Sequence, residues 1–141
     1  MNPLEILIIE DNPGDIRLIK EAFNEIQIIH NLHFIENGIE AILFLKKKEK
    51  YIDVPTPNFI LLDLNLPKKN GFEVLKEIKQ EKELKKIPVV ILTISASEED
   101  VIRSYEAYAN CFIKKPVDMD EFIKIVQGIT DFWFKYVKLP L

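Results

Sequence analysis

The hydrophobic residues of this chain follow two patterns that alternate along its length. Short continuous apolar runs are typical of strands covered on both faces, and we predict strands at Leu4–Ile9, Leu32–Ile35, Phe59–Leu62, Val89–Thr93 and Cys111–Lys114. Stretches with apolar residues three or four positions apart predict helices at Asp15–Ile26, Ile39–Lys47, Phe72–Glu81, the segment after the N-cap candidate Ser97, and Asp118–Val137. This alternation predicts an α/β fold, with helices on both faces of a five-stranded parallel sheet.

Length, charge and cysteine content narrow the class of protein. The 141 residues suffice for one ordinary domain with its own core, and the net charge of −4 offers no basic field to nucleic acid. No apolar run approaches the length of a signal-peptide core or a membrane span. The single cysteine, Cys111, fits a reducing compartment and is expected to be a buried structural thiol. We therefore expect a cytoplasmic protein that binds neither nucleic acid nor membrane.

Polar side chains stand at the ends of four predicted strands. Glu10 and Asp11 follow the first strand, Asp63 follows the third, the fourth ends at Thr93, and Lys115 comes just after the fifth. The carboxyl ends of parallel strands share one edge of the sheet, where open α/β folds bind their ligands. Because a carboxylate is costly to bury, Asp63 after the apolar run FILL indicates an acidic pocket at that edge.

This set of side chains fits phosphoryl transfer. Clustered carboxylates repel one another unless a cation joins them, and hard oxygen ligands favour Mg²⁺ or Mn²⁺ over zinc. A carboxylate is also a possible nucleophile toward phosphorus, which makes Asp63 the candidate acceptor of an aspartyl phosphate. A bound cation, the Lys115 ammonium and the Thr93 hydroxyl would hold the phosphoryl oxygens.

The chain resembles the receiver domains of two-component response regulators over its whole length. The resemblance rests on Glu10-Asp11, on Asp63 in LLDLNLPKKNG, on Thr93 in VVILTIS, and on Lys115-Pro116 in FIKKPVD. The segments EDNPGD and DFWFKYVKLP resemble in particular the stand-alone regulators that partner bacterial phytochromes. The resemblance implies the flavodoxin-like receiver fold with strand order 2-1-3-4-5. It also implies a single domain over residues 1–141, with a long C-terminal helix and no output domain.

The resemblance also implies a role for each acid of the pocket. Asp63 would accept a phosphoryl group from a sensor histidine kinase or a phosphotransfer protein. Asp11 and Asp63 would ligate Mg²⁺ or Mn²⁺ together with the main-chain carbonyl of Asn65, while Glu10 would act through a metal-bound water. The protein would catalyse only its own phosphorylation and dephosphorylation, and would otherwise not be an enzyme.

The same resemblance implies how the phosphorylated state is sensed. Lys115 would pair with Asp63 and then with the phosphate, and the Lys115–Pro116 peptide bond is expected to be cis. Thr93 would move toward the phosphoryl group and donate a hydrogen bond to it. Phe112 occupies the aromatic switch position three residues before the lysine, and without a tyrosine hydroxyl its switch would rest on packing alone.

The signal is expected to leave through contact with an unidentified downstream protein. On a helical wheel of the last helix, the apolar arc that includes Met119 covers about half of the circumference, wider than the stripe of about 100° that a core-facing helix needs. The surplus predicts a homodimer in which Phe132 or Tyr136 meets a second copy, with part of the fourth helix and the fifth strand.

Two other functions remain open from the sequence. A degenerate receiver would dock partners without accepting phosphate, although Asp63, Thr93 and Lys115 are all intact here. A small phosphatase with an aspartate nucleophile would place a second aspartate two residues later, where this chain has Asn65. One departure from the family bears on rate: Ile94 stands where the residue is usually small, and it is expected to narrow access to Asp63.

Overall fold

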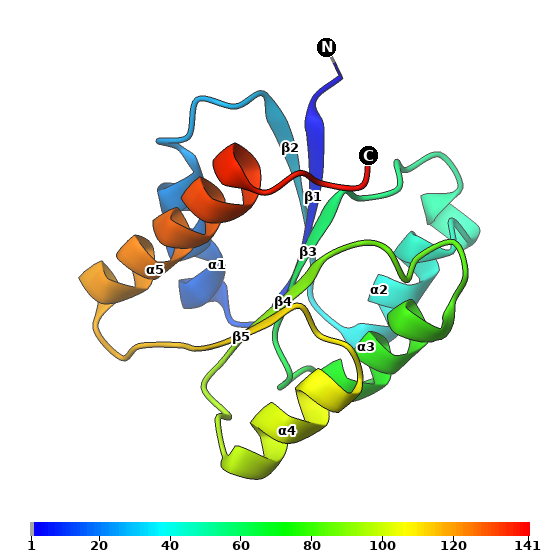
Figure 1. The fold of residues 1–141 in the computed structure, drawn as a ribbon. Helices are drawn as coiled ribbons and strands as arrows, with labels where there is room; N and C mark the ends of the chain where they lie inside the picture. Colours follow the sequence, from blue (N-terminus) through cyan, green and yellow to red (C-terminus); the bar gives the residue numbers. More distant parts are fainter. Residues whose placement is uncertain (1) are drawn as a thin grey trace.

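Five parallel strands form one sheet, and helices cover both of its faces (Figure 1). The computed structural model describes residues 2–141. The strands are hydrogen-bonded in the order β2-β1-β3-β4-β5, and their bounds are β1 Leu4–Ile9, β2 His30–Ile35, β3 Phe59–Leu62, β4 Val89–Thr93 and β5 Cys111–Lys114. The predicted fold class and strand order are confirmed, and the strand order reverses between β1 and β3.

Each of the five α-helices begins at a capping side chain that accepts a hydrogen bond from the backbone N–H three residues later. The helices are α1 Pro13–Phe23, α2 Gly38–Leu45, α3 Gly71–Gln80, α4 Glu98–Glu106 and α5 Met119–Asp131. Their caps are, in the same order, Asn12, Asn37, Asn70, Ser97 and Asp118. Within residues 2–141, no helix combines the length and the apolar character needed to cross a membrane.

Two layers of apolar side chains hold the helices on the sheet. One layer joins strand residues such as Leu7 and Ile91 to α2 and α3, and the other joins Ile8 and Val90 to α1 and α5. Every residue of β3 and β4 is buried, as their continuous apolar runs predicted. Only Ser104 of α4 is fully buried. This helix is therefore held on the sheet by less apolar burial than its neighbours.

The free edge of β5 is partly covered by α4. The N–H of Phe112 donates to the Tyr105 hydroxyl at 3.1 Å, so a side chain of α4 occupies a backbone group of the edge strand. Phe112 itself is half-buried against the layer formed by α2 and α3. Cys111 is also half-buried, less than predicted, and burial raises the pKa of its thiol, which fits a structural residue.

The last α-helix ends earlier than predicted. α5 stops at Asp131, and Phe132–Tyr136 form a π-helical turn in which the Val137 N–H donates to the Phe132 carbonyl at 3.1 Å. An i→i+5 turn takes side chains out of the α-helical repeat, so the chain stays helical to Tyr136 but the predicted α-helical periodicity ends at Asp131. The wheel also misplaced Met119 at the start of the arc, because its side chain is exposed.

The aromatic residues of this turn divide into two pairs. Trp133 and Phe134 pack on Phe59, at the start of β3, with ring centroids 5.6 Å and 5.1 Å away. Phe132 and Tyr136 point outward and remain 56% and 78% exposed. Part of the surplus apolar arc therefore covers the core, and the other part stays at the surface.

Candidate functional site

The backbone at the carboxyl ends of the strands continues the hydrogen bonding of the sheet. The N–H of Asp63 donates to the Ile9 carbonyl at 3.0 Å, and the N–H of Lys115 donates to the Thr93 carbonyl at 2.8 Å. The N–H of Glu10 likewise bonds the carbonyl of the last residue of β2 at 2.9 Å. The functional side chains therefore project from fixed backbone, although they lie beyond the strands.

The loop after Asp63 is closed tightly by a glycine. The N–H of Gly71 donates to the Leu64 carbonyl at 2.9 Å, and α3 begins at this residue. A Cβ added to Gly71 would lie 2.4 Å from the carbonyl oxygen of Asp63. A larger residue would therefore push apart the acceptor and the start of α3.

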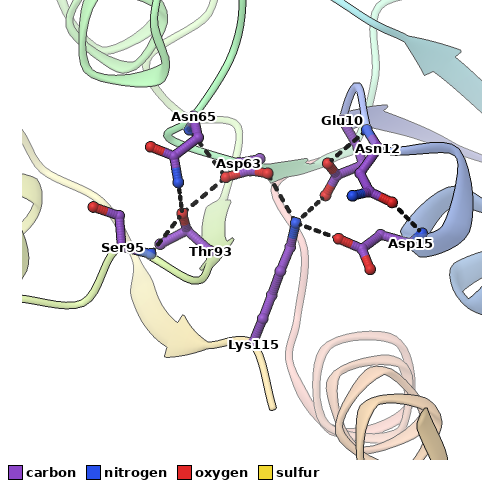
Figure 2. A network of polar contacts seen from close by, with 8 residues as sticks. All are labelled: Glu10, Asn12, Asp15, Asp63, Asn65, Thr93, Ser95 and Lys115. Atoms are coloured by element: carbon purple, nitrogen blue, oxygen red, sulfur yellow. Dashed lines mark hydrogen bonds and ion pairs between the residues drawn. The ribbon is translucent and has the colours of Figure 1, made fainter. Parts of the chain in front are cut away.

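Lys115 reaches across the site to three carboxylates (Figure 2). Its Nζ lies 2.6 Å from Glu10 Oε1, 2.7 Å from Asp15 Oδ2 and 2.8 Å from Asp63 Oδ2. Burial by itself would lower the pKa of Lys115, but its hydrogen bonds to Asp15, Asp63 and Glu10 outweigh burial and raise the pKa above its usual value. The predicted pairing of Lys115 with Asp63 is thus present.

The predicted cis bond before Pro116 is wrong, because the Lys115–Pro116 peptide bond is trans. Trans is the favoured form of a bond before proline, by about 0.5–1 kcal/mol. The lysine reaches its three partners from this backbone.

Thr93 is already turned toward the acceptor. Its hydroxyl donates to Asp63 Oδ1 at 2.8 Å, and the N–H of Asn65 donates to the same oxygen at 3.0 Å. The Asn65 side-chain amide in turn donates to the Thr93 hydroxyl at 3.3 Å. The Thr93 hydroxyl therefore already contacts the Asp63 carboxylate, and its movement toward a phosphoryl group stays a prediction.

Glu10, Asp11 and Asp63 form a group that fits a divalent cation. One carboxylate oxygen from each lies within 4.8 Å of the others. Burial, followed by the nearby charge of Asp63, raises the pKa of Glu10 to about 7, although Lys115 acts in the opposite direction. A hard cation would relieve this repulsion, and the all-oxygen donor set suits Mg²⁺ or Mn²⁺.

The structure adds one residue that the sequence interpretation missed. In the sequence, Asp15 stands only at the start of a predicted helix, yet its carboxylate pairs with Lys115 at the site. The available signal was its position in the first turn of α1, which begins soon after β1 and so faces the carboxyl edge of the sheet.

Ile94 is the residue that the sequence expected to narrow access to Asp63. It is 67% exposed in the structure.

A comparison with protein-family models matches residues 6–127 of this chain to the response regulator receiver domain. The chain belongs to the response regulator receiver family. Response regulator Rcp1 of Synechocystis sp. (strain PCC 6803) is 49% identical over 138 residues, a match that spans 98% of this receiver and 94% of Rcp1. Receiver domains are signalling proteins rather than conventional enzymes, and membership implies interaction with a histidine kinase or another phosphodonor.

Two solved structures resemble the receiver closely. The Mn²⁺-bound form of Rcp1 matches with a TM-score of 0.96 and 48% identity, over 99% of this chain and 100% of that one. The phosphorylated cyanobacterial phytochrome response regulator RcpA matches with a TM-score of 0.97 and 42% identity, again over 99% and 100% of the two chains. The receiver is therefore similar to one regulator solved with a divalent metal and to another solved in phosphorylated form.

Proposed function

We propose that the receiver accepts a phosphoryl group on Asp63 from a phosphohistidine of a sensor histidine kinase or a phosphotransfer protein. The observation that carries the proposal is the surrounding of this carboxylate. One oxygen is paired with Lys115, the other accepts from Thr93 and Asn65, and two further acids stand within cation-sharing distance. These groups match the demands of phosphoryl transfer, which are positioning and charge neutralisation.

The transfer step needs the groups of this site, the donor and a proton from water. A carboxylate oxygen of Asp63 forms a bond to phosphorus while the P–N bond to the donor imidazole breaks, and the departing imidazole nitrogen takes up a proton from water. Lys115 and Thr93 would hold oxygens of the phosphoryl group. A small phosphatase with an aspartate nucleophile would carry its acid, a second aspartate, at the position of Asn65. Asn65 offers only amide and backbone donors there, so the site favours a receiver over a phosphatase.

The direct test is chemical labelling. The protein is incubated with acetyl phosphate and Mg²⁺, and its intact mass and peptides are measured. We expect one added phosphoryl group, located on Asp63. A protein that stays unlabelled under conditions in which a known receiver is labelled would instead fit a docking module that does not use phosphate.

We infer that Asp11 and Asp63, with the main-chain carbonyl of Asn65, would hold Mg²⁺ directly and that Glu10 would act through water. The bound ion would neutralise charge on phosphoryl oxygens. Asp11→Ala should weaken Mg²⁺ binding strongly, by about tenfold or more, since it removes a charged ligand, and Glu10→Ala should weaken it less. Calorimetric titration measures both, and variants that bind like the wild type would contradict the assignment.

Thr93 and Phe112 would report phosphorylation together. The Thr93 hydroxyl would exchange its carboxylate partner for a phosphoryl oxygen, and Phe112 would move from half-buried to buried. Because the Phe112 N–H is bonded to Tyr105, this movement would also loosen or shift α4. Thr93→Ala should still accept phosphate but leave the nuclear magnetic resonance shifts around Phe112 unchanged when a phosphoryl mimic is added. Equal shifts in variant and wild type would refute the coupling.

We further propose that the receiver acts in the cytoplasm and signals through contact with a downstream protein. Its match to Rcp1, itself a response regulator, spans 94% of that protein, which supports a role in signalling. A pull-down with the phosphorylated and the unphosphorylated receiver tests this, because a downstream partner should prefer one of the two forms.

A homodimer is the contact that the surface itself favours. Phe132 and Tyr136 are exposed at the end of the last helix, and large aromatic side chains at a protein surface are enriched in interfaces. Ile102 and Tyr105 of α4 are also exposed, and the Tyr105 hydroxyl bonds the edge strand β5 at Phe112. We propose that these groups meet their counterparts in a second copy across a two-fold axis.

Replacing both Phe132 and Tyr136 with Asp should give folded monomers, because the two side chains contribute to the surface and not to the core. Sedimentation of wild type and variant, with and without beryllofluoride as a phosphoryl mimic, measures the change. Ile52→Asp is the matched control, since the exposed fraction of Ile52, 70%, lies between those of Phe132 and Tyr136, and Ile52 is far from both in the sequence. A wild type that is monomeric at high concentration in both states would rule out the dimer.

A further inference from the structure

Asp15 is the one carboxylate around Lys115 to which phosphoryl transfer assigns no role. Its Oδ2 lies 2.7 Å from Lys115 Nζ, as close as the oxygens of Glu10 and Asp63. Those two acids also belong to the cation-compatible group found among residues 2–141, and Asp15 does not. A cation and a phosphoryl group would therefore both draw on the other two carboxylates and leave Asp15 to the lysine.

An acid in the first turn of a helix has an ordinary explanation. Such residues interact favourably with the helix dipole, and all five α-helices carry one at the same place, namely Asp15, Glu40, Glu73, Asp100 and Glu121. Asp15 differs because its carboxylate reaches a buried ammonium from another element and its side chain is only 23% exposed. The dipole does not account for that contact.

The cap of α1 fixes Asp15 relative to the site. Asn12 accepts a hydrogen bond from the Asp15 N–H at 3.0 Å through its side chain, and its own N–H donates to Glu10 Oε2 at 3.2 Å. Figure 2 shows Asn12 between the two acids, with Lys115 reaching both carboxylates. Asp15 therefore stands on a backbone turn that is tied to the same site.

We propose that Asp15 is a positioning residue, which shares the ammonium of Lys115 with Asp63 and keeps the lysine from pairing too strongly with the acceptor. The inference rests on the proposed function of Asp63. The Lys115 ammonium donates to Asp15 and Asp63 and also pairs with Glu10, so three carboxylates share one charge. Without Asp15, the Lys115 ammonium pairs more strongly with Asp63. This pairing makes the Asp63 carboxylate a weaker nucleophile and leaves the lysine less available to bind an incoming phosphoryl oxygen.

The test compares labelling rates with acetyl phosphate and Mg²⁺. Asp15→Asn, which keeps the shape and removes the charge, should slow labelling of Asp63 by about tenfold, the effect of losing one charge-assisted hydrogen bond. Asp15→Glu should recover part of the rate, and Mg²⁺ affinity should stay near that of the wild type. Glu121→Gln is the matched control, because Glu121 holds the same capped position in α5. Labelling of Asp15→Asn at the wild-type rate or faster would overturn the proposal.

A double-mutant cycle separates positioning from a structural role. In a Lys115→Ala background, Asp15→Asn should cause no further slowing, because the group through which it acts is gone. Equal slowing in both backgrounds would mean that Asp15 acts on the helix or on the donor, and the proposal would be wrong.

A second measurement needs no phosphodonor. With Mg²⁺ present, Asp15→Asn should shift the side-chain resonances of Lys115, while Glu121→Gln should leave them in place. Unchanged Lys115 resonances in Asp15→Asn would overturn the inference. Failure of the wild type to be labelled would overturn the proposed function of Asp63. The Lys115 resonances would still test whether Asp15 positions the lysine.

Discussion

Asp63→Asn is expected to abolish labelling by acetyl phosphate. The amide that replaces the carboxylate has no anionic oxygen to attack phosphorus, while its size and its contacts with Thr93 and Asn65 are nearly preserved. Mass spectrometry of the intact protein and its peptides measures the label. The expected effect is a complete loss, since no other residue replaces the nucleophile.

The control for this variant is Asp53→Asn, which changes the same atoms at an exposed position outside the site. It should be labelled like the wild type. Equal and persistent labelling of Asp63→Asn would show that the acceptor lies elsewhere, and would remove the main support for the proposed function.

Lys115→Ala is expected to cost the metal-free protein about 3 kcal/mol of unfolding free energy, because it leaves buried carboxylates without their cation. The ammonium side chain is only 3% exposed and is shared by Glu10, Asp15 and Asp63. Urea unfolding in the presence of a chelator measures the loss. Mg²⁺ should then stabilise the variant more than the wild type, since the ion supplies the missing positive charge.

Lys135→Ala is the matched control, because Lys135 pairs with Asp131 on the surface, where both side chains are more than half exposed. A pair of this kind contributes about 0–1 kcal/mol. If Lys115→Ala were as stable as Lys135→Ala without metal, the buried carboxylates would have to be compensated by protonation alone. The stabilising contribution assigned here to the ion pairs of Lys115 would then be wrong.

The elements that the sequence predicted best are those whose signal is local. β1, β3, β4 and β5 have the predicted bounds, because each is a short apolar run that ends at or just before a polar residue. The start of α4 follows from Ser97, the N-cap candidate that the sequence offered. The convergence of Glu10, Asp63 and Lys115 followed from one rule on parallel sheets, and the structure brings their side chains together.

The features that the sequence did not predict depend on contacts between distant residues or on backbone details without a repeat. Asp15 and Lys115 are 100 positions apart, and the place of α1 after β1 puts Asp15 near the carboxyl edge of the sheet without showing that its side chain reaches the lysine. The π-helical turn after Asp131 depends on i→i+5 bonding, which has no spacing signature in the sequence. The trans bond before Pro116 was missed because the expectation came from resemblance alone.

The packing of Trp133 on Phe59 has a consequence for spectroscopy. Trp133 is the single tryptophan of the chain, and its ring packs on Phe59, the first residue of β3. Asp63 follows the other end of that strand, roughly 13 Å from Phe59 along the strand. The fluorescence of Trp133 should therefore report unfolding but stay silent when Mg²⁺ enters the site. The ring of Phe132, a proposed dimer contact, stands edge-on to the indole at 5.7 Å, so a change in emission on concentration would signal self-association. A flat emission curve in a metal titration is thus the expected outcome for a receiver that binds metal normally.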